Sequence, residues 1–342
     1  MKRKKIVTIG GGTGSFTLLS GLKKYPVDIS AIVSMADDGG STGVLRDELG
    51  VLPPGDVRQC LVALSESSQT LRELINYRFE DGGLKGHNFG NLLLSALEKI
   101  HGSFSKGVEE AIRILNVKGQ VIPVTSNDAR LFLELSSGKV LEGEDEINHN
   151  YQLQKSGIKR MYFSPEVNAS KKAINSILEA DMIIIGPGNH YCSIIPNFLV
   201  KGISQAIKKS KALVVYNCNL VNKKGHTENF QLGDYVNSLE QYIGKGRIDY
   251  VTANCKRPSE SLIRKYESQR ELLVAFQDEI IKERTYKIIK ADILSRKKPT
   301  YSKADAIANE RAFIRHDSDK LAKILMTALE IRDFQSMIKE IV

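Results

Sequence analysis

Two adjacent carboxylates stand where a strand is expected to end: Asp37 and Asp38 run directly into the glycine-rich stretch 39–43. Paired carboxylates in such a loop suit a hard divalent cation such as Mg²⁺, or the base and hydroxyl groups of a nucleotide. The alternative is a purely structural turn in which both side chains are solvated and bind no ligand. A dinucleotide-dependent dehydrogenase would place one ribose-binding acid about 20 residues past its glycines. Asp37 lies 27 residues past Gly10, so the spacing argues against a nicotinamide-dependent enzyme.

A cluster of glycines, GGGTGS at 10–15, follows the first expected strand. It departs from the dinucleotide fingerprint G-x-G-x-x-G because its third position is Ser15. Glycine lets backbone N–H groups approach a phosphate closely, and a helix that begins there adds a favourable dipole. Thr13 and Ser15 add hydroxyl groups at the start of that helix. The loop therefore favours phosphate or pyrophosphate binding over a simple tight turn.

Polar loops follow the other expected strands as well. Because ligands of doubly wound sheets bind outside the carboxyl ends of the strands, these loops predict one site for an extended anionic ligand. The five loops are 10–15, 36–43, 125–130, 186–193 and 217–227.

Two further segments add polar residues to this prediction. In LPPGDVRQC (52–60), Asp56 is expected to cap a helix and to aim Arg58 outward, where it could meet phosphate. In GHNFGN (86–91), His87 is as readily a structural histidine as a ligand, whereas His190 is expected to be peripheral. The residues that we expect to bind a nucleotide or its phosphates are Gly11, Gly12, Thr13, Gly14, Asp37, Asp38, Ser41, Asp56, Arg58, His87, Asn88, Asn91, Thr125, Gly186, Gly188, Asn189, Ser193, Asn217 and Asn219.

The elements that must position these residues alternate along the chain. Buried strands and amphipathic helices in turn predict an α/β fold with a doubly wound, mostly parallel, Rossmann-like sheet. Alternating segments around Ser137 and Gly138 predict a small β-hairpin insertion at 131–147. The expected strands are 5–9, 28–35, 120–125, 180–189, 212–219 and 249–254, and the expected helices are 15–24, 56–66, 71–79, 91–100, 108–117 and 170–179.

We expect a single α/β domain over 1–342. Residues 1–255 would form the sheet and its crossover helices. Residues 256–342 would form a helical C-terminal portion that completes the ligand site and holds one further strand near 287–294. The best candidate for a mobile surface loop is RKKPTYSKAD at 296–305.

Composition excludes several classes of protein. The 342 residues are 42% hydrophobic, and no apolar run approaches the roughly 18–20 residues of a membrane span. Since the start of the chain also lacks the apolar region of a signal peptide, we expect a cytoplasmic protein. The net charge of +9 suits an anionic small ligand, and no motif predicts nucleic-acid binding. The four cysteines lack CxxC spacing, which indicates buried thiols rather than a zinc site or disulfides.

Taken together, these stretches resemble a known family. GGGTG, ADDGGSTG, LPPGDVRQCLVAL, GHNFGNLLLSAL, GQVIPVT, ADMIIIGPG, CNL and the late FIRHD (313–317) occur in the order seen in YvcK/CofD-like proteins. That family contains the bacterial gluconeogenesis factor and the 2-phospho-L-lactate transferase of coenzyme F420 synthesis. GQVIPVT and RHD are most similar to the gluconeogenesis-factor branch.

The resemblance to that branch implies a nucleotide-sugar-binding regulator. Its ligand would be UDP-N-acetylglucosamine or UDP-glucose, with no cofactor required and no catalysis. The resemblance also implies a role in growth on gluconeogenic carbon sources and, through protein partners in cell-wall synthesis, in cell shape. The branch's ligand-contacting residues fall on Tyr266, which can stack on a base, and on Arg315, which can meet a pyrophosphate.

The sister branch implies an enzyme instead, and we keep it as the alternative. It would transfer a phospholactyl-type group from a nucleotide diphosphate donor, with Mg²⁺ held by Asp37 and Asp38. The metal would neutralise charge on the departing group.

The amphipathic C-terminal helices are compatible with a homodimer and equally with simple core packing.

Overall fold

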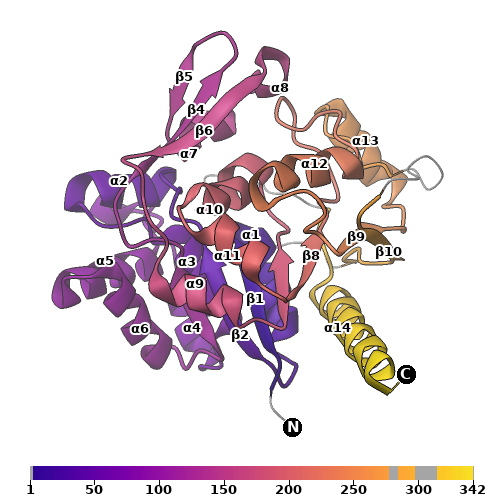
Figure 1. Ribbon diagram of the computed structural model, residues 1–342. Coiled ribbons are helices and arrows are strands. Elements are labelled where there is room, and N and C mark those ends of the chain that lie inside the picture. Colours follow the sequence, from indigo (N-terminus) through magenta and orange to yellow (C-terminus); the bar gives the residue numbers. More distant parts are fainter. Residues whose placement is uncertain (1–2, 277–283, 297–313, 342) are drawn as a thin grey trace.

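The computed structural model describes residues 3–276, 284–296 and 314–341 (Figure 1). Seven strands form one sheet in the order β10-β9-β8-β7-β1-β2-β3, and every neighbouring pair is parallel. The predicted doubly wound α/β fold is therefore confirmed. The strands are β1 (Lys5–Gly10), β2 (Asp28–Val33), β3 (Gln120–Pro123), β7 (Met182–Ile185), β8 (Leu213–Asn217), β9 (Tyr250–Asn254) and β10 (Lys287–Ala291).

The strand order reverses direction between β1 and β7. From β1 the chain adds β2 and β3 on one side, and then β7 to β10 on the other. In open α/β sheets the crevice at such a switch point, outside the carboxyl ends of the strands, is where ligands bind. The fold thus places the loops after β1 and β7 beside each other.

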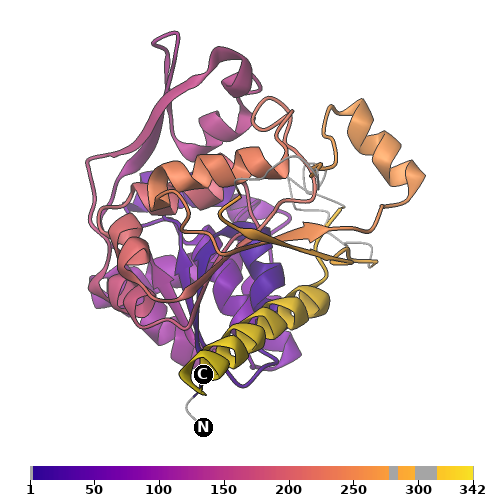
Figure 2. The ribbon, with the colours of Figure 1, turned by 45° about the vertical axis from the view of Figure 1, so that its right-hand side comes forward.

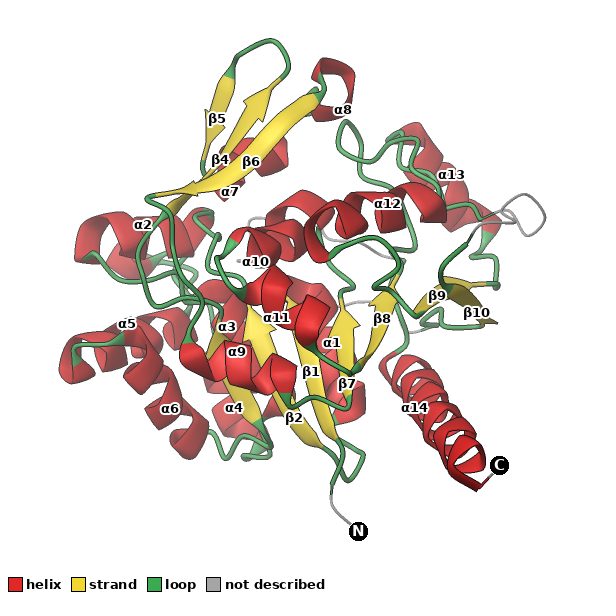
Figure 3. Cartoon of the chain, viewed as in Figure 1, coloured by secondary structure: helices red, strands yellow, loops and turns green. Residues whose placement is uncertain are grey.

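Helices cover both faces of the sheet, and Figure 3 shows α9 and α11 in front of the strands with α1 and α3 behind them. Helix α1 packs against α3 and α14, whereas α11 packs against α9 and α12. The helices are α1 (Gly12–Leu22), α2 (Gly40–Leu49), α3 (Gly55–Leu64), α4 (Gln69–Asn76), α5 (Phe89–His101), α6 (Phe104–Ile114), α9 (Lys171–Leu178), α10 (Ile195–Leu199), α11 (Ile203–Lys209), α12 (Leu232–Ile243), α13 (Glu260–Ser268) and α14 (Ser318–Ile341), with a short 3-10 turn at Gly82–Leu84 and a π turn at His190–Ile194.

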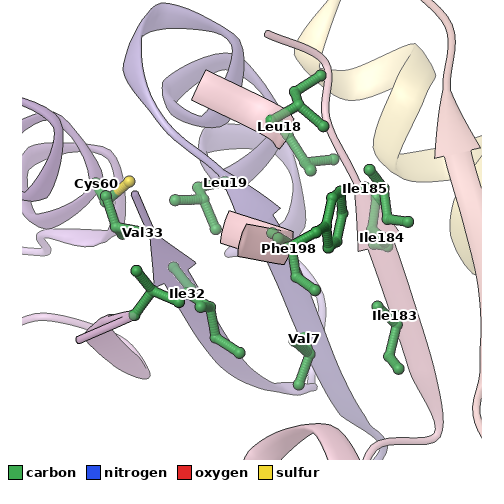
Figure 4. Packing of buried hydrophobic residues seen from close by; sticks show 14 of the residues in the cluster. Val7, Leu18, Leu19, Ile32, Val33, Cys60, Ile183, Ile184, Ile185 and Phe198 are labelled. Atoms are coloured by element: carbon green, nitrogen blue, oxygen red, sulfur yellow. The ribbon is translucent and has the colours of Figure 1, made fainter. Parts of the chain in front are cut away.

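The core lies on both faces of the central strands. Strand β7 reads MIII, and all four side chains are fully buried. A strand covered by helices on both faces has no polar side, so its apolar run is continuous. Figure 4 shows Ile184 and Ile185 of β7 packed with Leu18 of α1 and Phe198 of α10. Three cysteines are buried, as predicted, but Cys255 is exposed, contrary to the prediction.

The last helix, α14, ties the two ends of the described chain together (Figure 2). Its residue Asp333 forms a 2.7 Å ion pair with Lys4, and Arg332 donates to the carbonyl oxygen of Asp181 at 2.6 Å.

No described helix is long and apolar enough to cross a membrane. The division at residue 255 stays a prediction, and the predicted loop 296–305 lies outside the described residues except for its first residue.

A three-stranded antiparallel sheet with two short helices, residues 130–164, stands over the carboxyl edge of the main sheet; we call it the cap (Figure 1). Its first two strands confirm the predicted hairpin. The prediction is wrong at 144–147, where three acidic residues begin a helix and complement its dipole. It also missed the third strand. The cap consists of β4 (Arg130–Leu135), β5 (Val140–Glu142), α7 (Glu144–His149), α8 (Leu153–Ser156) and β6 (Ile158–Ser164).

The buried strand β7 gives a test of where the stability lies. We expect Ile184→Ala to lower the free energy of unfolding by about 2–5 kcal/mol, because it leaves a cavity in a fully buried position. Ile100→Ala is the matched control, since Ile100 is 74% exposed, and it should change stability by less than about 0.5 kcal/mol. Urea denaturation of both variants measures this, and equal losses would contradict the assignment of the core.

Candidate functional site

The first glycine loop and the loop after β7 touch through bare backbone. A side chain at Gly14 would clash with the carbonyl oxygen of Pro187, and one at Gly11 would clash with the carboxylate of Asp56. Helix α1 begins at Gly12 without a side-chain cap or an acidic residue in its first turn. The N–H of Gly12 donates to the carboxylate of Asp56, which therefore sits at the start of the helix. Binding of an anion by the other N–H groups of this turn stays a prediction.

Three carboxyl groups gather beside these loops. Burial, followed by the charge of Asp37, raises the pKa of Asp56 to about 8 and that of Glu144 to about 8. Burial is also the main cause that raises the pKa of Asp37. At neutral pH the cluster therefore holds protons, and its acids can donate hydrogen bonds to an anion. Glu144 was missed by the sequence analysis because it comes from α7 of the cap.

The two adjacent aspartates face different neighbours. Asp37 accepts a hydrogen bond from the N–H of Gly39 at 3.2 Å, and its charge acts on Asp56. Asp38 instead accepts from the N–H of Asp145 at 2.8 Å and so holds the first turn of α7. No group of three or more His, Cys, Asp or Glu side chains within the described ranges is arranged to hold a metal ion. A metal bound by Asp37 and Asp38 with substrate phosphates stays a prediction.

Arg58 corrects the prediction made for it. Helix α3 begins at Gly55 after Pro54, so Asp56 lies in the first turn and is not the N-cap. Arg58 is buried rather than aimed outward. Its Nε donates to Asn91 at 3.0 Å and its Nη1 to Asn76 at 2.7 Å. From there its charge lowers the pKa of Asp37 and of Asp56, opposing the effect of burial.

Several other predicted ligands form a hydrogen-bonded cluster with Arg58. The hydroxyl of Ser41 lies 3.1 Å from Nδ1 of His87 and accepts from the N–H of Asn88 at 3.4 Å. The side chain of Asn88 accepts from the N–H of Asn91 at 3.2 Å and caps α5. Both asparagines are buried. These hydrogen bonds join α2 to α5, and contact of the same residues with a ligand stays a prediction.

Asparagines after β8 hold the loop after β7. Asn217 is fully buried and donates to the carbonyl oxygen of Gly186 at 3.2 Å. Asn219 donates to the carbonyl oxygen of Gly188 at 3.0 Å. Its own buried Oδ1 has no hydrogen-bond partner in the part of the chain that the structure describes. The same loop approaches Ser193, so these predicted residues are brought together.

A pocket of about 220 Å³ lies beyond Asn219, at the ends of β8 and β9. Lys256 and Arg257 contribute positive charge to its wall. Asn219 lines the pocket and also donates to Gly188 of the loop after β7, so the pocket adjoins that loop. The apolar part of the wall consists of Leu220, Leu232, Ala253, Leu273, Val274 and Phe276.

The late residues lie against the same end of β8. His316 Nε2 is 3.2 Å from the carbonyl oxygen of Cys218, which lines the pocket, so the segment that carries Arg315 passes beside it. Tyr266 is 4% exposed, and its hydroxyl accepts from the N–H of Ile314 at 3.1 Å. Its contact is thus with the segment that carries Arg315, and stacking on a base would require the ring to be uncovered.

The remaining predicted residues are distributed around the cleft. Thr125 is buried and accepts from the N–H of Asn127 at 3.2 Å, a local turn away from the glycine loops. Asn189 donates to Asn148 of the cap at 2.8 Å. Lys223 also bonds Asn148, and its charge lowers the pKa of Glu144. Lys223 and Asn148 are site residues that the sequence analysis missed.

The histidines near the cleft are buried. His190, expected at the periphery, lies 2.8 Å from the hydroxyl of Ser238, and burial lowers its pKa to about 3. Burial likewise lowers the pKa of His226 to about 3 and that of His316 to about 4. All three are therefore neutral at physiological pH.

Comparison with known proteins identifies the family. A family model described as "2-phospho-L-lactate transferase CofD" matches residues 6–294. This chain belongs to the CofD family. The predicted YvcK/CofD-like relationship is thereby confirmed.

Relatives of the chain carry the gluconeogenesis name. The "Gluconeogenesis factor" of Bacillus subtilis (strain 168) is 39% identical over 331 residues, covering 96% of this chain and 99% of the relative. That of Halalkalibacterium halodurans is 42% identical over 274 residues, covering 79% and 83%. An X-ray structure of a Bacillus halodurans protein matches with a TM-score of 0.85 and 36% identity, covering 95% of this chain and all of that one.

The raised pKa of Asp56 predicts a pH dependence of stability. The folded state keeps a proton on Asp56 up to about pH 8, whereas the unfolded state loses it near pH 4, so folding takes up a proton between these values. The wild type therefore loses stability as the pH rises through this window. Asp56→Asn removes the effect and should gain at least about 1 kcal/mol relative to wild type between pH 5 and pH 8.

Urea denaturation at pH 5, 6.5 and 8 checks this expectation. The exposed Asp81→Asn is the matched control and should follow the wild-type profile. Parallel profiles for wild type and Asp56→Asn would show that the carboxyl group is ionised in the folded protein.

Proposed function

We propose that the protein binds a nucleotide sugar, UDP-N-acetylglucosamine or UDP-glucose, across the carboxyl edge of its sheet and acts as a regulator. One observation carries the proposal: Asn219 joins backbone loops of the phosphate-binding type to a partly apolar pocket of about 220 Å³. A nucleoside diphosphate has the same two parts in sequence, an anionic diphosphate and a flat base.

The diphosphate would lie over the two glycine loops. The N-terminus of α1 supplies N–H groups and a favourable dipole there. Protonated Asp56 and Glu144 would donate hydrogen bonds to phosphate oxygens instead of repelling them. Arg315 would add a charge-assisted contact from the neighbouring segment.

The base would enter the pocket at the ends of β8 and β9. Leu273, Val274 and Phe276 offer apolar contact to a flat ring. The unpartnered Oδ1 of Asn219 is a ready acceptor for the imide N–H of uracil. The sugar would then lie toward the cap, where Glu144 and Asn148 can bind its hydroxyl groups.

The regulatory role rests on the relatives. Proteins about 40% identical to this chain are named gluconeogenesis factor, which supports a role in carbon metabolism. We extend this proposal to cell-shape and cell-wall homeostasis in the cytoplasm, through protein partners that respond to the bound nucleotide sugar. No cofactor would be required for that binding.

Calorimetric titration of UDP-N-acetylglucosamine and UDP-glucose tests the proposal. Asn219→Ala and Arg315→Ala should each weaken binding at least tenfold, about 1.4 kcal/mol, because each removes a contact to the base or the diphosphate. The exposed Asn175→Ala is the matched control and should bind like wild type. No binding of either sugar nucleotide at millimolar concentration would overturn the proposal.

The second candidate is a 2-phospho-L-lactate transferase-like enzyme, favoured by the name of the matching family model. Asp37 and Asp56 repel each other across the cleft, and a Mg²⁺ ion beside them would relieve that repulsion. Asp37 with Asp38 would hold the metal. The metal would supply charge neutralisation for group transfer from a nucleotide diphosphate.

Magnesium dependence separates the two candidates. The regulator should bind its UDP-sugar equally well with Mg²⁺ and with EDTA, because its phosphate contacts come from the protein. The transferase should instead prefer GDP, require Mg²⁺, and lose at least tenfold in affinity in Asp37→Asn. Titration of GDP and of both UDP-sugars, each with and without Mg²⁺, decides between them.

A further inference from the structure

A second pocket lies outside the cleft, between α1, α3 and α4, and encloses about 280 Å³. It shares no lining residue with the pocket at β8 and β9. Nothing in the proposed function uses it. Its wall consists of Phe16, Ser20, Lys23, Val62, Ala63, Gln69, Arg72, Glu73 and Asn76.

Two cations, Lys23 and Arg72, contribute to this wall. Arg72 is half-buried, and its side chain has no ion pair or hydrogen bond to any described residue. Lys23 is also half-buried and donates to the carbonyl oxygen of Ser65 at 3.0 Å. Burial first, and then the charge of Arg72, lower the pKa of Lys23, so the two cations are close enough to repel.

The acids nearby offset only part of this positive charge: the wall holds two cations, Lys23 and Arg72, and one acid, Glu73. Glu73 is exposed, and its carboxylate accepts from Gln69 at 2.7 Å. Glu66 acts favourably on Lys23, but Lys24 and Lys118 act against it. The pocket thus combines an excess of positive charge with a partly enclosed volume, which is the setting that an anion stabilises.

The apolar residues of the wall favour a ligand that carries a carbon skeleton. Phe16 is 37% exposed and, with Val62 and Ala63, forms an apolar side. Asn76 stands at the back, where its Oδ1 accepts from Arg58 at 2.7 Å. A ligand in this pocket would therefore lie one residue away from the arginine that sets the charge balance of Asp37 and Asp56.

We propose that this pocket is a second ligand site, which binds a small phosphomonoester between Lys23 and Arg72. The dianion would match the two cations, and the carbon skeleton would contact Phe16 and Val62. Its position behind Arg58 suits a metabolite that modulates the cleft without entering it.

Lysine acetylation followed by mass spectrometry tests this in the full chain. Glycerol 3-phosphate at millimolar concentration should reduce the labelling rate of Lys23 at least threefold. Lys24 is the internal control, since it is exposed and its labelling should not change. Glycerol should protect neither lysine, and inorganic phosphate should protect Lys23 less than the ester does. Equal labelling of Lys23 with and without the ester would overturn the proposal.

Variants place the binding at this pocket rather than at the glycine loops. Arg72→Gln should abolish the protection of Lys23, and it removes no side-chain hydrogen bond or ion pair between described residues. Arg113→Gln, an exposed arginine on α6, should leave the protection intact. Protection that persists in Arg72→Gln would also overturn the proposal. Neither result depends on whether the cleft binds a UDP-sugar, so the two proposals fail separately.

Discussion

The backbone contact between the loop after β1 and the loop after β7 is the constraint on which the cleft depends. Strands β1 and β7 are direct neighbours in the sheet, and their loops leave it at the switch point of strand order. Since a side chain at Gly14 would clash with Pro187, the two loops fit together only as bare backbone. That fit fixes the start of α1, and with it the direction of the N–H groups that face the cleft.

Electrostatics adds a second condition. Asp37, Asp56 and Glu144 repel one another in a partly buried space, and Arg58 opposes this from behind. Glu144 reaches the cluster from α7, whose first turn is held in part by the hydrogen bond to Asp38. The cleft is therefore complete only with the cap in place, and the paired aspartates divide two tasks between them. Asp37 belongs to the cluster of carboxyl groups, and Asp38 positions the cap.

The sequence predicted the sheet well because its central strands are buried on both faces and read as continuous apolar runs, as in β7. Helix α2 was missed because its sequence GSTGVLRDEL has little apolar periodicity. The convergence of the strand-end loops followed from parallel topology alone. The direction of Arg58 did not, since it depends on asparagines from α4 and α5 that only tertiary packing brings together. Glu144 carried no motif, and only the docking of the cap reveals it.

The chemistry available in the cleft is compatible with both names met in the comparisons, gluconeogenesis factor and 2-phospho-L-lactate transferase. In the proposed binding mode the groups that face the phosphates would be backbone N–H groups, which stay constant while side chains change. The buried histidines are neutral; His190 lies against the hydroxyl of Ser238 and His316 against the carbonyl oxygen of Cys218. Burial and the charge of Asp37 raise the pKa of Asp56 and that of Glu144 to about 8, a range that would suit a general acid as well as a hydrogen-bond donor to phosphate. Whether such a cleft binds or catalyses then depends on the ligand: a stable sugar diphosphate finds donors there, whereas an acceptor nucleophile with Mg²⁺ would find an acid and a charge partner.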